Sequence, residues 1–158
     1  MSLFCRVIQP ADLEEIMAFE NKKMIELYKD EMERNLQSWN ARWRKESLEH
    51  YLPLGWSFLA RLEDVESEFS IEGQLVGYFI AQPMLFTDGH TQSLWVEHLS
   101  YASLKARDEL CELAYKLGKE KHFQKVYFPN VSGISNSVSG FKSEIWQPQV
   151  LSIKTAKI

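Results

Sequence analysis

The chain has 158 residues and a formal net charge of −4, and 45% of its residues are apolar while 25% are charged; these values are typical of one globular domain over residues 1–158 with a substantial core. The acidic balance argues against a dedicated nucleic-acid-binding protein, which would normally be basic. No apolar run reaches the roughly 18 residues that a membrane span needs, and the N-terminal residues lack the apolar region of a signal peptide, so we expect a cytoplasmic protein without a membrane partner.

The N-terminal third predicts one strand followed by two helices. Phe4–Ile8 has the composition of a short strand. An acidic helix start at Asp12 is followed by apolar residues at helical spacing as far as Leu27. A second helical segment covers residues 31–51, where charged residues separate the large apolar ones, and Pro53 closes it.

The central part predicts antiparallel strands joined by hairpins. Residues 56–62 and 75–81 are apolar runs of strand length, and the acidic segment 63–73 between them predicts a solvated hairpin connection. Gln82-Pro83 is expected to end or bulge the second of these strands. Asp88-Gly89 then predicts a tight hairpin turn.

Residues 94–128 predict a strand, an amphipathic helix and a second strand. Leu94–Leu99 and Lys125–Phe128 have strand character, and Ser103 is placed to cap the helix between them. A crossover of this kind makes the two strands parallel. Ligands bind at the carboxyl end of the first strand in such units, opposite the helix N-terminus, so residues 99–107 are the expected functional edge.

The C-terminal part is less regular. Residues 130–140 are rich in small polar side chains and predict a loop with at most one weak helical turn. Ile145–Lys154 returns to strand character, and Pro148 within it predicts an edge strand or a bulge. The order of elements therefore predicts an α/β domain, with a mixed, mostly antiparallel sheet flanked by helices and one βαβ crossover.

Four segments in this order resemble the GNAT (Gcn5-related N-acetyltransferase) family. Residues 6–16 are similar to the opening strand and acidic helix start of that family, and Leu75-Val76-Gly77-Tyr78 resembles its third strand. Glu97-His98-Leu99 resembles the acidic residue and leucine of its fourth strand, and Gly140-Phe141-Lys142 resembles its closing Gly-Phe turn. The resemblance covers nearly the whole chain and implies a GNAT-like mixed sheet.

The resemblance also implies an activity, the transfer of an acetyl group from acetyl-CoA to an amine. It places Glu97 as the general base, with His98 as a second candidate, and Tyr101 as a substitute for the family's tyrosine acid; Tyr127 is a further substitute. The residues expected to bind the cofactor, on the fourth strand, the next helix and the segment after the fifth strand, are Leu99, Ser100, Tyr101, Ser103, Lys105, Arg107 and Asn130.

Two departures from the family pattern leave the function open between two classes. The glycine-rich loop that cradles the CoA pyrophosphate is replaced by Ser103, Lys105 and Arg107, and Asn136 stands where the tyrosine acid is expected. The two cationic side chains either bind phosphate by charge, point into solvent, or mark a lost cofactor site. The chain is then either an N-acetyltransferase or a catalytically inactive binding or regulatory module, and a homodimer is open in both cases.

The remaining signals are weaker. Cys5 and Cys111 are expected to be buried thiols, and the four histidines show no spacing typical of a zinc site. The segment 39–44 interleaves two tryptophans with two arginines, which suits an acceptor pocket, a protein partner or a base-stacking surface; the plain expectation is a helix with both tryptophans inward and both arginines outward. The amine acceptor itself is not identified.

Overall fold

The structure is a computed structural model, in which residues 2–63 and 73–155 are described. The acidic connection predicted for residues 63–73 lies almost wholly outside the described residues. Among the residues described, no helix is long and apolar enough to cross a bilayer.

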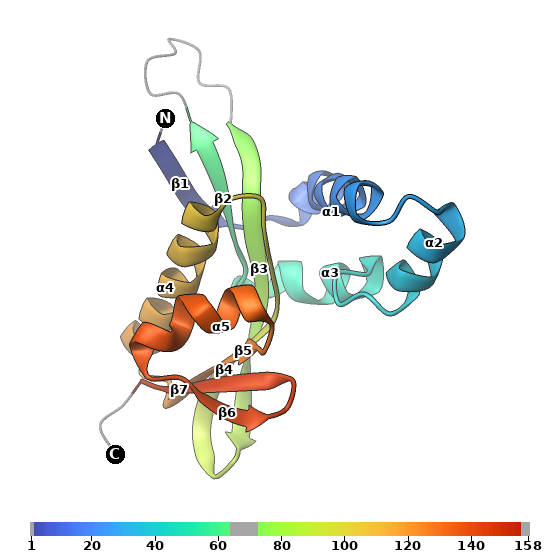
Figure 1. Cartoon of the computed structure of the whole chain (residues 1–158). Coiled ribbons are helices and arrows are strands. Elements are labelled where there is room, and N and C mark those ends of the chain that lie inside the picture. The colour runs from blue at the N-terminus through green and yellow to red at the C-terminus, as the bar shows by residue number, and fades with distance from the viewer. Residues whose placement is uncertain (1, 64–72, 156–158) are drawn as a thin grey trace.

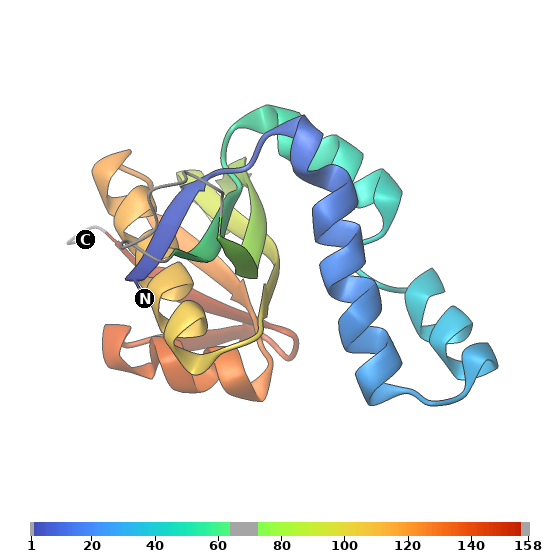
Figure 2. The ribbon, with the colours of Figure 1, turned by 90° about the horizontal axis from the view of Figure 1, so that it is seen from above.

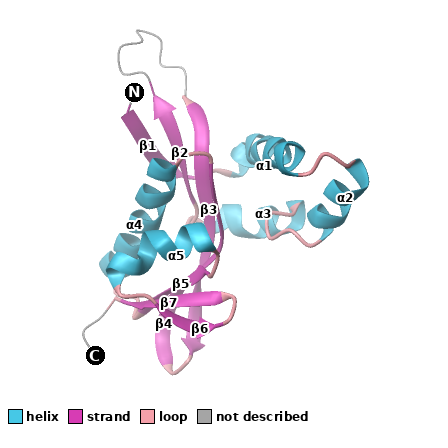
Figure 3. Ribbon diagram, viewed as in Figure 1, coloured by secondary structure: helices cyan, strands magenta, loops and turns pink. Residues whose placement is uncertain are grey.

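Seven strands form one twisted sheet in the order β1-β2-β3-β4-β5-β7-β6 (Figure 3). Every neighbouring pair is antiparallel except β4 and β5, which are parallel as predicted from the crossover. The strands are β1 (Ser2–Val7), β2 (Phe58–Glu63), β3 (Gln74–Thr87), β4 (His90–Tyr101), β5 (Lys125–Pro129), β6 (Glu144–Gln147) and β7 (Val150–Lys154).

The helices cover the two faces of the sheet. Helices α4 and α5 pack on one face, and α1 and α3 pack on the other. Helix α2 lies away from the sheet, beyond α1 and α3 (Figures 1 and 2). Ser103 caps α4 by accepting a hydrogen bond from the Ala106 amide, as predicted. The helices are α1 (Leu13–Leu27), α2 (Glu31–Trp39), α3 (Lys45–Tyr51), α4 (Leu104–Glu120) and α5 (Ser132–Val138).

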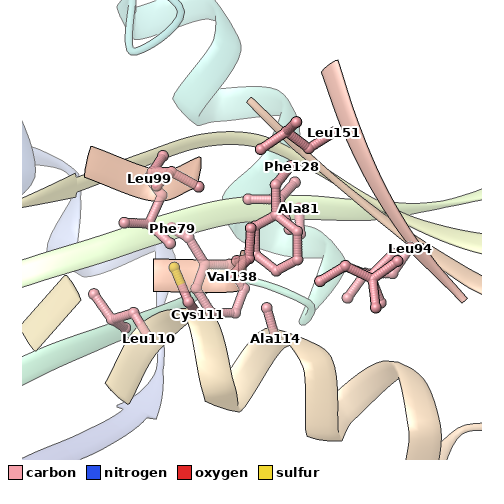
Figure 4. Packing of buried hydrophobic residues seen from close by; sticks show 14 of the residues in the cluster. Phe79, Ala81, Leu94, Leu99, Leu110, Cys111, Ala114, Phe128, Val138 and Leu151 are labelled. Carbon is pink, nitrogen blue, oxygen red and sulfur yellow. The ribbon is translucent and has the colours of Figure 1, made fainter. Parts of the chain in front are cut away.

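The larger hydrophobic core lies between the sheet and the α4–α5 face. Phe79 of β3 and Phe128 of β5 are fully buried there against Leu110 and Ala114 of α4, and Figure 4 shows these side chains together. A smaller cluster on the opposite face joins Ile16 of α1 to α3 and β3. The amphipathic pattern of α4 is therefore used as predicted, with its apolar stripe against the sheet.

The hairpin between β3 and β4 confirms the Asp-Gly turn and extends both strands. Asp88 and Gly89 have φ angles of 52° and 75°, which are typical of a tight two-residue hairpin turn. The expectation that Gln82-Pro83 ends or bulges the strand is wrong, because β3 continues to Thr87 and both residues pair with β4 in unbroken register. Beyond Phe79, β3 pairs only with β4 and not with β2, so Pro83 lies where an edge strand tolerates a missing amide.

The single helix predicted for residues 31–51 is two helices, α2 and α3, separated at residues 40–44. Trp43 in this break is only 8% exposed, whereas Trp39 at the end of α2 is 65% exposed. The expectation of two inward tryptophans is thus wrong for Trp39. The amphipathic face of α2 does not continue into α3, because the chain breaks and turns at Asn40.

Three further expectations need correction. Residues 132–138 are the helix α5 rather than a loop, because Ile134 and Val138, four apart, are both buried against α4 and the sheet and this packing outweighs weak helix propensity. The strand predicted for residues 145–154 is a hairpin of β6 and β7 around Pro148, although the expected edge position is confirmed for β6, which ends the sheet and has a register shift between Ile145 and Gln147. Of the two free cysteines, Cys111 is buried but Cys5 is only partly buried.

Candidate functional site

The site is organised by the point at which β4 and β5 separate. Their parallel pairing covers only three residue pairs, from Ser93↔Lys125 to Trp95↔Tyr127. Beyond Trp95, β4 continues to Tyr101 paired with β3 alone, while β5 ends at Pro129. The β5-facing edge of β4 beyond Trp95 therefore has no strand partner among the described residues.

A cavity of about 510 Å³ lies at this separation. Its walls come from the end of β4, the end of β5, helix α5, the α2–α3 break and the β6–β7 turn, so it is assembled from segments distant in the sequence. The lining combines apolar side chains with amide, guanidinium and imidazole groups. The lining residues are Asn40, Arg42, His98, Leu99, Pro129, Asn130, Val131, Ile134 and Gln149.

A β-bulge at Glu97 sets the direction of the side chains on β4. His98 pairs with Ile80 and Val96 pairs with Ala81, so Glu97 is an extra residue between them. Because of this insertion, Glu97 contacts Tyr51 of α3 and His98 contacts Glu20 of α1, so both side chains lie on the face that α1 and α3 cover. Successive strand residues normally point to opposite faces. The bulge thus brings the two candidate bases to the same side of the sheet.

The Glu97 carboxylate accepts two hydrogen bonds and lies within ion-pair distance of Arg42. Its Oε2 accepts a hydrogen bond from Trp95 Nε1 at 2.6 Å and from the Tyr51 hydroxyl at 3.3 Å. Arg42 Nη1 lies 3.7 Å from Oε1. Burial, followed by the charge and hydrogen bond of Glu97, raises the pKa of Tyr51 to about 12. The Tyr51 hydroxyl therefore keeps its proton at neutral pH and donates a hydrogen bond to Glu97.

His98 belongs to a buried network that sequence reasoning missed. Its Nε2 lies 3.1 Å from Oε1 of Glu20, a residue of α1 that is only 4% exposed. The same oxygen accepts a hydrogen bond from the Tyr78 hydroxyl at 2.7 Å. Burial raises the pKa of Glu20, but the hydrogen bond and charge of His98 and the hydroxyls of Tyr78 and Ser100 outweigh burial, and the net pKa is lowered. Glu20 is therefore an ionised, buried acceptor for the His98 ring.

The lowered pKa of Glu20 predicts a pH-dependent contribution to stability. A carboxyl with a depressed folded-state pKa stabilises the fold above its ordinary value, about 4.5 here, and this stabilisation is lost as the pH falls through the folded-state pKa. We expect Glu20→Gln to lower the free energy of unfolding by about 1 to 3 kcal/mol at pH 7. Urea unfolding from pH 7 to pH 3 should show the difference from wild type shrinking below about pH 4.5; a constant difference would contradict the assignment.

Lys23 extends this network towards Tyr101. Its ammonium donates to the Ser100 hydroxyl at 2.8 Å and to the Tyr101 carbonyl at 3.0 Å, and it lies 5.4 Å from the centre of the Tyr101 ring. Burial lowers the pKa of Lys23, opposed by the charges of Glu20 and Glu26. The side chain of Ser100 thus faces α1 rather than the cavity.

Tyr101 lies between the start of α4 and the start of α5. A Cβ placed on Gly133 would lie 2.0 Å from the Tyr101 hydroxyl, so the phenol lies directly against the α5 backbone. Arg107 of α4 lies over the same ring at 5.9 Å and pairs with Asp108 at 3.0 Å. The first turn of α4 keeps Lys105 exposed.

The structure brings together part of the residues expected from sequence. His98, Leu99 and Asn130 line the cavity, and Asn130 also holds the β6–β7 turn by donating to the Pro148 carbonyl at 2.8 Å. Ser103, Lys105 and Arg107 lie at the start of α4 and do not line it. Of the other tyrosine candidates, Tyr127 is fully buried, in ring contact with Trp95 and Trp146.

Sequence reasoning missed Glu20 and Gln149, whereas Asn40 falls in the segment 39–44 that was one candidate for an acceptor pocket. A signal for Glu20 was present, because it follows the buried Ile16 by four residues and so falls on the apolar stripe of α1. Asn40 and Gln149 reach the cavity only through the α2–α3 break and the β6–β7 turn, neither of which the hydrophobic pattern predicts. In the part of the chain that the structure describes, no cluster of three metal-ligating side chains occurs.

The thioester arm of acetyl-CoA fits the cavity better than its pyrophosphate fits the start of α4. The cavity and the unpaired edge of β4 suit a thioester arm, with Leu99, Ile134 and Asn130 as its neighbours. At the start of α4, the Ser103 hydroxyl and carbonyl already accept from the Ala106 and Arg107 amides, and no glycine lies there to let the backbone surround a pyrophosphate closely. Lys105 is the exposed cation there, and a phosphate would be held by charge rather than by backbone amides.

Comparison with known proteins supports the fold. No protein-family model matches the sequence, and no curated protein matches it. Among solved structures, the chain is similar to the polyamine N-acetyltransferase of Drosophila melanogaster (13% identity, TM-score 0.62, 96% of this chain and 98% of that chain). It is also similar to a GNAT-family acetyltransferase of Listeria monocytogenes (15% identity, TM-score 0.61, 96% and 94%).

A third similar structure is a chain of the NatC complex bound to Gag peptide and CoA (12% identity, TM-score 0.61, 99% of this chain and 100% of that chain). These similarities extend over nearly the full length of each chain, and the shared architecture includes the mixed sheet and its flanking helices. The chain therefore has the fold of the GNAT N-acetyltransferases.

Proposed function

We propose that the chain is a GNAT-like N-acyltransferase that moves an acetyl group from acetyl-CoA to a primary amine. The observation that carries this proposal is the cavity at the β4–β5 separation, whose lining combines apolar side chains that suit a thioester arm with a histidine held by a buried carboxylate. The acetyltransferase fold of the chain supports the same conclusion. The predicted cytoplasmic location and the homodimer stay predictions.

The chemistry requires a proton acceptor for the attacking amine. Acetyl-CoA supplies an activated acyl group; the amine nitrogen forms a bond to the thioester carbonyl carbon, the C–S bond breaks, and one proton leaves the nitrogen. His98 lines the cavity, and its Nε2–H is directed to Glu20, which leaves Nδ1 as the proton-accepting atom. Glu97, the first candidate from sequence, already accepts from Tyr51 and Trp95 and does not line the cavity, so the geometry favours His98.

Tyr101 was the sequence-based candidate for protonating the departing thiolate. Its hydroxyl lies against Gly133 of α5, on the α4–α5 side of the separation, where a thioester arm would leave the cavity. A thiolate is a tolerable leaving group without a strong acid. The role of Tyr101 therefore stays a prediction.

The contact between Tyr101 and Gly133 favours a second function, ligand binding without acetyl transfer. The phenol of Tyr101 packs on Gly133, the Ser103 hydroxyl caps the start of α4, and no residue of α4 lines the cavity. These observations suit a GNAT-fold module that binds a ligand in the cavity without turning over CoA. The two functions differ in whether acetyl-CoA binds.

Thermal unfolding with and without acetyl-CoA separates the two functions. A ligand present at 100 times its dissociation constant stabilises the folded state by about 2.7 kcal/mol, so the acyltransferase is expected to show a rise of several degrees in Tm. Desulfo-CoA and ADP in parallel distinguish binding through the arm from binding through the phosphates. No shift with millimolar acetyl-CoA would contradict the acyltransferase and support the binding module.

A further inference from the structure

The charge of the cavity differs from that expected for a site that binds polycations. Of the nine side chains that line it, Arg42 is the one that carries a formal charge at neutral pH, apart from any proton on His98. The other polar lining side chains are the neutral amides of Asn40, Asn130 and Gln149. No lining residue is a carboxylate, so the cavity offers no counter-charge for a second cationic group on the acceptor.

The Arg42 guanidinium has donors to spare. Its Nη1 lies 3.4 Å from the Glu97 carbonyl oxygen and 3.7 Å from the Glu97 carboxylate, both long contacts. Among the described residues, no other hydrogen bond or ion pair engages the Arg42 side chain, which is 38% exposed. A guanidinium presents five N–H donors in a planar fork. Both contacts of Arg42 described above involve Nη1 alone.

Arg42 is also held beside the proposed proton acceptor. The neighbouring Trp43 is buried and anchors the α2–α3 break, and the Nη1 contact is made to the backbone of Glu97, which directly precedes His98. The guanidinium and the His98 ring therefore line the same cavity, and Arg42 contacts the backbone of the residue before His98. This juxtaposition suits a ligand that carries an anionic group close to its amine nitrogen.

We infer that the acceptor is an amine bearing a carboxylate next to the amine, as in an α-amino acid, and that Arg42 binds this carboxylate. The planar fork of arginine matches a carboxylate in a two-point hydrogen-bonded pair. The amine of the same molecule then lies towards His98. The inference rests on the proposed acyl transfer for the fate of the amine, whereas recognition of the carboxylate rests on the cavity alone.

Matched ligand pairs that differ only in the carboxylate test the recognition without any turnover. The twenty common amino acids are first screened by the Tm of the protein, and those that bind are compared by calorimetry with their decarboxylated amines, for example L-arginine with agmatine and L-lysine with cadaverine. We expect the amino acid of a pair to bind about tenfold to a hundredfold more tightly, as a charge-assisted hydrogen-bonded pair requires. Equal binding within the pairs, or no binding by any amino acid, would overturn the inference.

Variants locate the recognition. Arg42→Gln should remove the preference within each pair, while Arg42→Lys should retain only part of it because a lysine ammonium lacks the fork. Arg44→Gln is the matched control: Arg44 lies in the same break, is half exposed and pairs with Glu46 at 3.5 Å, and it does not line the cavity. A preference that survives in Arg42→Gln would assign the carboxylate to another residue and contradict the proposal.

Turnover distinguishes this inference from the proposed function. With acetyl-CoA as donor, release of free CoA thiol is measured for both members of each pair. Release with agmatine and cadaverine at the same kcat/KM as with the amino acids supports acyl transfer and contradicts the carboxylate site. Amino-acid binding that depends on Arg42, without any thiol release, supports the carboxylate site and contradicts acyl transfer.

Discussion

His98→Gln is expected to lower kcat/KM for acetyl transfer by about two to four orders of magnitude, the range that general-base catalysis contributes. The amide occupies nearly the same volume as the ring but does not accept a proton from the amine. The measurement is thiol release with the best acceptor of the panel.

Two companion variants make the assignment of the base decisive. Glu97→Gln removes the competing carboxylate while leaving hydrogen-bond capacity, and a large loss there with a small loss in His98→Gln would show that Glu97 is the base. Glu20→Gln tests Glu20 as a positioning residue: we expect an intermediate loss in kcat with little change in KM, because the ring loses its ionised partner at 3.1 Å. An unchanged kcat in Glu20→Gln would leave Glu20 a purely structural residue.

Phe79→Ala is expected to lower the free energy of unfolding by about 3 to 5 kcal/mol, as for other large aromatic side chains removed from cores. Phe79 is fully buried at the centre of the sheet (Figure 4) and its ring lies 5.7 Å from that of Phe58. Two contributions add up: the variant loses the free energy gained by burying the ring, and the closely packed strands leave a cavity in its place. Equilibrium urea unfolding measures the change.

Leu85→Ala is the control for this core substitution. Leu85 lies on the same strand, near the β3–β4 turn, and is 61% exposed. A surface substitution of this kind is expected to change the free energy of unfolding by less than about 0.5 kcal/mol. Similar losses in the two variants would mean that β3 does not form the centre of the core.

The sequence predicts the parts of the fold that short-range patterns determine. Ser103 at the helix start, the apolar stripe of α4 and the Asp88-Gly89 turn each depend on residues within a few positions of one another, and all three are confirmed. The order of these elements was enough to identify the GNAT-like fold. Helix α5 was missed because its stability comes from two buried side chains and not from local propensity.

The candidate site is less predictable because its parts meet only through tertiary structure. Glu20 and His98 are 78 positions apart, and no local pattern links them. Arg42 was noticed for its aromatic neighbours, but the break that turns it into the cavity depends on the burial of Trp43 and on a contact with the β4 backbone. Glu97 and His98 were correctly placed on β4, although the bulge that gives them a common side has no signature in the residues themselves.

The bulge at Glu97 has a consequence for changes in the length of β4. Removing Glu97 would join Val96 to His98 in an unbroken ladder with β3, and every other side chain of the strand would keep its present face. Removing Val96 or His98 instead would move Glu97 into the vacated position opposite Ala81 or Ile80, and a deletion further along β4 would turn over the residues between the deletion and the bulge. In a deletion scan of the strand, loss of Glu97 is thus expected to be the change that leaves the other pairs of β3 and β4 as they are.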